Sequence, residues 1–188
     1  MKICISGLTG SGKSTLSKRL AEHYGVPLLS GGDMLKKLIA GDEAMADPGW
    51  WEREVGRAAM EIRRRDPGFD KRVDEELIKA ALRLRDVVLD SWTMPYLLEA
   101  EDKVAIFLKA DLKVRAKRVA LRDGLPVEVA EERIRRKDSE TAEIYEKLYG
   151  FRLGEDLRPF HLVLDTSRLN RDQVFSIVRR FVDWWFGR

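Results

Sequence analysis

Short apolar runs bounded by polar residues recur along the chain and predict buried β-strands. Four runs are well defined: Ile3–Ile5, Val87–Leu89, Val104–Leu108 and Leu162–Leu164. A fifth, Pro27–Leu29, is weaker. Because the runs are apolar throughout rather than alternating, they are typical of parallel strands covered on both faces of a sheet.

The segments between these runs carry apolar residues at the spacing of amphipathic helices. Three such stripes are Leu16, Leu20, Tyr24, then Leu112, Ala116, Val119, Ala120, and finally Val174, Ile177, Val178, Phe181, Trp185. Strands that alternate with helices predict a doubly wound α/β fold. Two helical insertions, at about 41–85 and about 126–149, stand apart from this alternation.

Length and composition narrow the function classes. The 188 residues fit one domain, and 35 basic against 32 acidic side chains give a net charge of +3, which does not indicate a general nucleic-acid binder. Cys4 is the single cysteine, so no intrachain disulfide or cysteine-cluster zinc site is expected. No apolar run approaches the ~20 residues of a membrane span, and the N-terminus lacks a signal-peptide layout. We therefore expect a cytoplasmic protein without a membrane partner.

The most specific motif is a glycine-rich phosphate-binding loop, the P-loop. It reads Gly7-Leu8-Thr9-Gly10-Ser11-Gly12-Lys13-Ser14, is followed by Thr15, and matches the pattern G-x-x-x-x-G-K-[ST] in full. Its place between a predicted strand and a predicted helix directs backbone N–H groups and the helix dipole toward phosphate oxygens. We expect Lys13 to reach the β- and γ-phosphates of ATP and the Ser14 hydroxyl to bind Mg²⁺.

A carboxylate at the end of another predicted strand is a candidate metal ligand. The run Val87–Leu89 ends in Asp90. In P-loop folds a strand beside the first one carries an aspartate that helps to hold magnesium. The alternative is an ordinary strand-end aspartate before a helix that begins at Ser91.

A glycine turn predicts a second phosphate site. The stretch Ser30-Gly31-Gly32-Asp33-Met34-Leu35-Lys36 lies at the carboxyl end of the second predicted strand, the edge where α/β folds bind ligands. Two interpretations stay open. Either Gly32, Asp33 and Lys36 bind an acceptor phosphate, or Asp33 caps a helix and Lys36 is solvated.

Taken in order, the motifs resemble a known family over nearly the whole chain. They are the P-loop, the 30–36 turn, Asp70-Lys71-Arg72-Val73-Asp74, Arg135-Arg136-Lys137-Asp138-Ser139-Glu140, Tyr145, Tyr149-Gly150-Phe151, and 161–168. Together they resemble the archaeal-type cytidylate kinases of the nucleoside monophosphate kinase family. The resemblance implies a five-stranded parallel core in one domain over 1–188, an acceptor-binding insertion at about 41–85 and a mobile lid at about 123–137. It also implies transfer of the γ-phosphoryl group of ATP to CMP or dCMP with Mg²⁺.

The resemblance also implies roles for individual side chains. Toward the acceptor it points to Lys36, Arg72, Asp74 and Asp138, and toward adenine to Thr166 and Ser167. At the two ends of the lid it points to four catalytic arginines, Arg118, Arg122, Arg135 and Arg136. These expectations rest on position in the family pattern.

Two departures from the family pattern concern the acceptor. Where the family has an acid-Gly-Arg sequence, this chain has Asp90-Ser91-Trp92, and Lys36 replaces an arginine with a point charge. Trp92 offers a stacking face to the substrate, or it packs beside Met94, Tyr96 and Leu97. A kinase for another small acceptor therefore remains an alternative.

Charge along the chain is uneven. Residues 113–137 hold nine basic and four acidic side chains, a net +5, which predicts either a solvated helix pair or a lid that closes over a triphosphate. A P-loop NTPase that uses this patch on nucleic acid is a further alternative. Arg63-Arg64-Arg65 predicts a solvated helix end. Trp184 and Trp185 predict core packing or a dimer contact, so we expect a monomer or weak homodimer.

Overall fold

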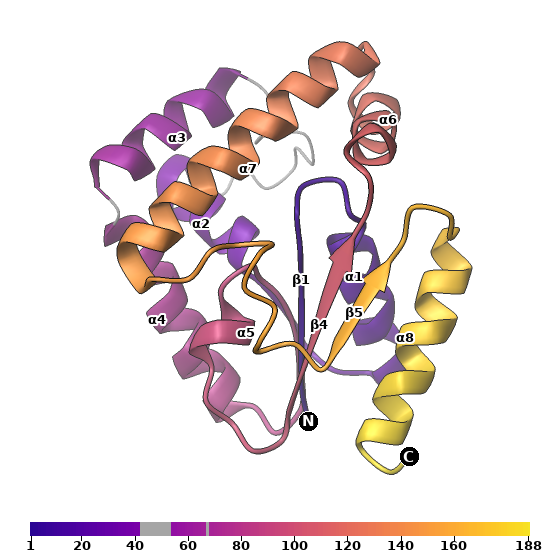
Figure 1. The fold of residues 1–188 in the computed structure, drawn as a ribbon. Coiled ribbons are helices and arrows are strands. Elements are labelled where there is room, and N and C mark those ends of the chain that lie inside the picture. Colours follow the sequence, from indigo (N-terminus) through magenta and orange to yellow (C-terminus); the bar gives the residue numbers. More distant parts are fainter. Residues whose placement is uncertain (42–53, 67) are drawn as a thin grey trace.

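The computed structural model describes residues 1–41, 54–66 and 68–188. In this part of the chain, five strands form one parallel sheet in the order β2-β3-β1-β4-β5 (Figure 1). The strands are β1 (Lys2–Gly7), β2 (Leu28–Ser30), β3 (Val87–Asp90), β4 (Lys103–Lys109) and β5 (Leu162–Asp165). The five apolar runs are therefore confirmed as strands, and so is the doubly wound α/β fold.

Helices cover both faces of the sheet (Figure 1). Helices α1 (Lys13–Tyr24) and α8 (Arg171–Trp185) pack on one face through side chains such as Leu20 and Val178, which are fully buried. Helices α2 (Gly31–Ala40), α4 (Gly68–Arg83) and α5 (Met94–Leu97) cover the other face. Two covered faces explain why the strands are apolar throughout.

Helices α3 (Glu54–Arg65), α6 (Leu112–Asp123) and α7 (Val127–Tyr149) lie beyond the carboxyl ends of the strands (Figure 1). Helix α6 turns at Gly124 into the long helix α7, and the two pack as a hairpin around Val119 and Ile134. Figure 1 shows α7 running beside α3. The range predicted as a lid, 123–137, covers the hairpin turn and the first half of α7.

The acceptor insertion predicted at 41–85 divides into two parts. Helix α3 lies away from the sheet beside α7, whereas α4 packs on the sheet through Leu77 and Ala81. Residues 42–53 and 67 of this insertion lie outside the described residues.

Two expectations from composition concern burial and membranes. Cys4 is fully buried in β1, and burial raises the pKa of its thiol to about 12, as expected for a core cysteine. Among the helices that the structure describes, none combines the length and the apolarity that a membrane crossing requires.

Candidate functional site

The carboxyl edge of the sheet opens into one large cavity of about 970 Å³. Its walls come from the P-loop, the first turns of α1 and α2, the inner side of α4, the end of β3, the α6–α7 hairpin and the loop after β5. Parallel strands end at the same edge, so residues distant in sequence converge here. Cavities of this size and position bind small molecules.

The P-loop curls over the end of β1 into the start of α1. Gly7 has φ +148° and Gly10 has φ +79°, values that L-side chains rarely adopt. A Cβ on Gly10 would also lie only 2.9 Å from the Arg115 carbonyl oxygen, so the close packing on α6 requires glycine. Of the predicted loop residues, Thr9 to Thr15 line the cavity, whereas Gly7 and Leu8 do not.

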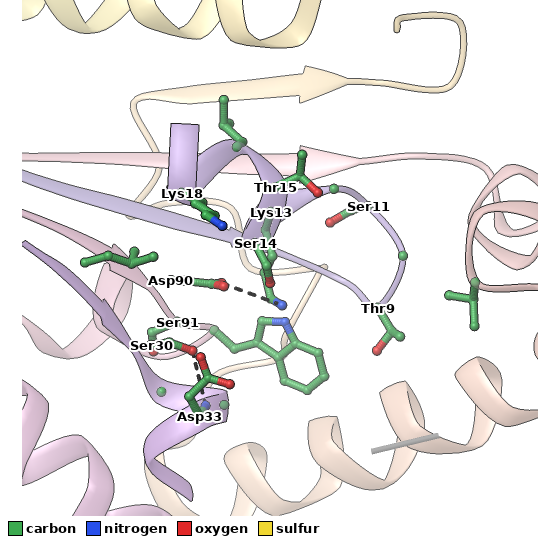
Figure 2. Close-up of a pocket in the computed structure, with 18 of the residues that line it drawn as sticks. Thr9, Ser11, Lys13, Ser14, Thr15, Lys18, Ser30, Asp33, Asp90 and Ser91 are labelled. Atoms are coloured by element: carbon green, nitrogen blue, oxygen red, sulfur yellow. Dashed lines mark hydrogen bonds and ion pairs between the residues drawn. The ribbon is translucent and has the colours of Figure 1, made fainter. Parts of the chain in front are cut away.

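The cation of the P-loop faces a buried carboxylate. Lys13 Nζ lies 3.7 Å from Asp90 Oδ1, which is the pair joined by a dashed line in Figure 2. Asp90 is 6% exposed, and within the described residues its Oδ1 atom accepts no hydrogen bond. The Ser14 side chain lines the same cavity. The site therefore has a phosphate-directed lysine beside a buried oxygen that retains free acceptor capacity.

These oxygens fit a magnesium ion. Mg²⁺ keeps several waters and takes one or two protein oxygens together with substrate phosphates. Asp90 Oδ1 and the Ser14 hydroxyl supply such a set. No cluster of three or more His, Cys, Asp or Glu side chains that could hold a metal is found in the described part of the chain.

The glycines that had been predicted as a turn form the first turn of α2, and their surroundings exclude the interpretation in which Asp33 caps the helix beside a solvated Lys36. Ser30, not Asp33, is the N-cap, because the Ser30 hydroxyl accepts a hydrogen bond from the Asp33 N–H at 3.1 Å. Lys36 is 2% exposed and lines the cavity, so the expectation of a solvated lysine was wrong. Gly32 and Asp33 line the cavity too, and Figure 2 shows Asp33 on the same side as Asp90.

Helix α4 contributes a buried carboxyl group with unusual proton affinity. Asp74 is 6% exposed and lines the cavity. It accepts hydrogen bonds from the Thr93 hydroxyl at 2.5 Å and the Tyr149 hydroxyl at 2.7 Å. Burial raises the pKa of Asp74 to about 6, although both hydrogen bonds favour the charged form. Arg72, expected beside it, instead lies exposed near Asp66 and does not line the cavity.

The structure overturns the prediction that Arg63 is solvated. Arg63 is 2% exposed at the end of α3, and its Nη2 and Nε atoms donate to the two carboxylate oxygens of Asp70 at 2.6 and 3.0 Å. Its Nη1 atom lies 3.5 Å from the Thr141 hydroxyl of α7. Arg63, Asp70 and Tyr145 all line the cavity, and motif reasoning had not assigned any of them to the site.

Trp92 follows the end of β3, where it packs against the P-loop and also lines the cavity, and its stacking on a substrate stays a prediction. Its indole Nε1 donates to the Gly7 carbonyl oxygen at 2.6 Å, which packs the ring against the P-loop. The ring also lines the cavity, with Lys13 Nζ 5.6 Å from its centroid and the Tyr145 ring edge-on at 6.3 Å. The Trp92 ring therefore lies between the P-loop and Tyr145 on the cavity wall.

The α6–α7 hairpin brings only part of its basic charge to the cavity. Arg118, Arg122 and Lys137 line it. Arg135 instead pairs with Glu131 at 2.8 Å on the exposed side of α7, and Arg136 is exposed outside the cavity wall. The structure therefore does not place these last two arginines among the cavity residues.

Two further predicted residues lie at different depths. Thr166, after β5, is 1% exposed and accepts a hydrogen bond from Arg118 Nη1 at 3.0 Å at the cavity wall. The Ser167 hydroxyl accepts from the Asp111 N–H at 2.9 Å, and Ser167 does not line the cavity. Asp138, expected at the acceptor, is also absent from the cavity wall and forms a buried ion pair with Arg115.

A parallel sheet of this strand order, with a P-loop after β1 and a buried aspartate at the end of the adjacent β3, defines the P-loop class of α/β proteins. Two solved structures share this fold. A protein of Eubacterium ventriosum superposes with a TM-score of 0.65 at 19% identity, covering 97% of this chain and 98% of that chain. A deoxyadenosine kinase from M. mycoides superposes at 0.59 with 16% identity, covering 97% of this chain and all of that chain.

Sequence relatives define the family. The cytidylate kinase of Methanopyrus kandleri is 35% identical over 190 residues, covering 96% of this chain and 92% of the relative. That of Pyrococcus horikoshii is 32% identical over 184 residues, covering 96% and 88%. Residues 2–168 match the cytidylate kinase-like family, and the chain belongs to that family. This confirms the resemblance inferred from the motifs.

Proposed function

We propose that this enzyme transfers the γ-phosphoryl group of ATP to CMP or dCMP and releases the diphosphate. The observation that carries the proposal is the arrangement of Lys13, Ser14 and Asp90 in a cavity that residues of α2 and α4 also line. That arrangement suits a donor triphosphate beside a small acceptor. Relatives that align over nearly the whole chain are named cytidylate kinases.

Each group has a distinct task in this mechanism. Backbone N–H groups of the P-loop and the Lys13 ammonium hold the donor phosphates, and Arg118 and Arg122 add positive charge from the hairpin. Ser14 and Asp90 would hold a magnesium ion, which when bound would supply positive charge to the donor phosphates. No strong base is required, because an acceptor phosphate oxygen is already nucleophilic. Closure of the proposed lid over 123–137 excludes water from the cavity.

The part of the cavity wall formed by the end of β3, Arg63, Asp33 and Asp74, here called the acceptor wall, supports a second candidate function. That function is the phosphorylation of another small molecule. Ser91 and Trp92 stand where the family pattern has glycine and arginine, so β3 ends without a guanidinium. Arg63 reaches the cavity wall, but Asp70 already binds it through two hydrogen bonds. Asp33 and Asp74 add carboxylates to the same wall. Lys36 lines the cavity beside these carboxylates, so an acceptor with hydrogen-bond donors is a second candidate next to a phosphorylated one.

An acceptor screen separates the two functions. The purified chain is incubated with ATP, Mg²⁺ and one acceptor at a time: CMP, dCMP, UMP, AMP, GMP, cytidine and a panel of non-nucleotide alcohols. ADP release and the phosphorylated product are both measured. Preferential turnover of CMP or dCMP supports the proposed function. Turnover of unphosphorylated acceptors, with none of the nucleotides, overturns it in favour of the second candidate.

A further inference from the structure

A buried ion pair joins the two helices of the hairpin directly beneath the P-loop. Asp138 of α7 and Arg115 of α6 are 8% and 7% exposed, and Arg115 Nη1 donates to Asp138 Oδ2 at 2.6 Å. Arg115 Nε also donates to the Ala110 carbonyl oxygen at 3.2 Å, which fixes the guanidinium at the start of α6. The pair is therefore rigidly placed with respect to both helices.

The same pair holds the main chain of one P-loop residue on both sides. The Thr9 N–H donates to Asp138 Oδ1 at 3.1 Å, and the Thr9 carbonyl oxygen accepts from Arg115 Nη1 at 2.9 Å. Thr9 lies between Gly7 and Gly10, two glycines with positive φ, so the backbone here is intrinsically permissive. The side chains of α6 and α7 supply the restraint that the glycines lack.

A second contact from the hairpin reaches the same loop. Arg118 Nη1 lies 3.3 Å from the Ser11 carbonyl oxygen, and the guanidinium also binds Thr166. Two guanidinium groups of one helix thus orient two carbonyls of the loop. When a guanidinium of α6 binds a loop carbonyl oxygen, that carbonyl points toward α6, and the neighbouring N–H groups point toward the cavity. Donor phosphates bind there.

We infer that Asp138 is a positioning residue, which, together with Arg115, sets the conformation of the P-loop and so the affinity for the donor phosphates. This replaces the acceptor contact that was expected of Asp138. The inference rests on the proposed function only in taking the P-loop as the donor site, and it is independent of the acceptor. Because these hydrogen bonds connect the α6–α7 hairpin to the P-loop, a movement of α7 would also displace the main chain of Thr9.

The test compares nucleotide affinity with thermal stability. Asp138→Asn keeps an oxygen for the Thr9 N–H but loses the charge that binds Arg115. Affinity for ATP and for ADP is measured by calorimetry at 25 °C without any acceptor, and melting is measured separately. We expect binding about tenfold weaker or more, since a hydrogen bond to a charged group is lost. Unchanged affinity with a lowered melting temperature would mean a merely structural pair and would overturn the inference.

Two further variants make the result decisive. Val178→Ala removes buried methyl groups from the core between α8 and α1 at a position that does not line the cavity, and serves as a control that lowers the melting temperature with unchanged ATP affinity. If Asp138→Asn does not fold, Arg115→Lys is tested in its place. A lysine ammonium keeps the positive charge but cannot reproduce the guanidinium hydrogen bonds to both Asp138 and Thr9. It should also weaken ATP binding, and normal affinity would again overturn the inference. Failure of the wild type to bind ATP would instead contradict the proposed function.

Discussion

Lys13 Nζ lies 3.7 Å from Asp90 Oδ1, which connects the first turn of α1 to the end of β3. The two groups come together because β1 and β3 are parallel neighbours, with Ile5 in register with Asp90. Asp90 is buried, so the ammonium offsets part of the cost of keeping its charge in the cavity. A donor triphosphate with magnesium would meet both groups at once.

Replacing Lys13 tests the donor side. Lys13→Ala should lower turnover about 100- to 1,000-fold, because one preorganised cation at the transferring phosphate is lost. Turnover is measured with saturating ATP and Mg²⁺, and circular dichroism checks the fold. Lys79→Ala, on the exposed side of α4, is the matched control and should retain full activity. Near-normal turnover of Lys13→Ala would rule out the proposed mechanism.

The role of Asp90 as a magnesium ligand is tested by measuring how activity depends on the Mg²⁺ concentration. Asp90→Asn should raise the Mg²⁺ concentration that gives half-maximal activity by at least about 10- to 100-fold, because loss of a group that only supports a ligand already has that effect and Asp90 would bind the metal itself. The measurement is a magnesium titration at fixed ATP, and a chelator should abolish activity of the wild type. An unchanged titration midpoint would remove Asp90 from the metal site.

The buried Arg63–Asp70 pair should dominate the stability of the α3–α4 region. Arg63→Ala leaves the Asp70 carboxylate buried without its partner and should lower the free energy of unfolding by about 3–5 kcal/mol. Its neighbour Arg64 is largely exposed, and Arg64→Ala should cost less than about 1 kcal/mol. Urea unfolding of both variants provides the comparison. Equal effects would contradict the burial of Arg63.

The carboxyl group of Asp74 should make stability depend on pH. Its pKa is raised from 3.8 to about 6, so the folded state favours the proton more than the unfolded state does. This contribution is fully present below about pH 4 and is lost as the pH rises through 6. Asp74→Asn lacks the group and should gain about 3 kcal/mol relative to the wild type between those limits. The difference in free energy of unfolding is measured from pH 4 to 8, and a constant difference would contradict the prediction.

Much of the fold and the donor site could be predicted from local sequence patterns. The apolar runs marked all five strands, and the spacing of glycines and Lys13 marked the P-loop, because both features depend on neighbouring residues. The carboxylate at Asp90 followed from the same logic, since a strand end next to β1 must reach the P-loop. The order of the motifs also identified the family.

Tertiary structure alone decided the environment of the charged side chains. Arg63 belongs to a run of three arginines that predicts solvation, yet it is buried because α3, α4 and α7 meet around Asp70. Asp138 matched a substrate position but supports Thr9, and Arg135 faces Glu131 instead of the cavity. The sequence by itself determined the strands, the P-loop and the family, because local spacing encodes them. Which charges face the ligand depends on packing between distant segments, and only the assembled fold determines that.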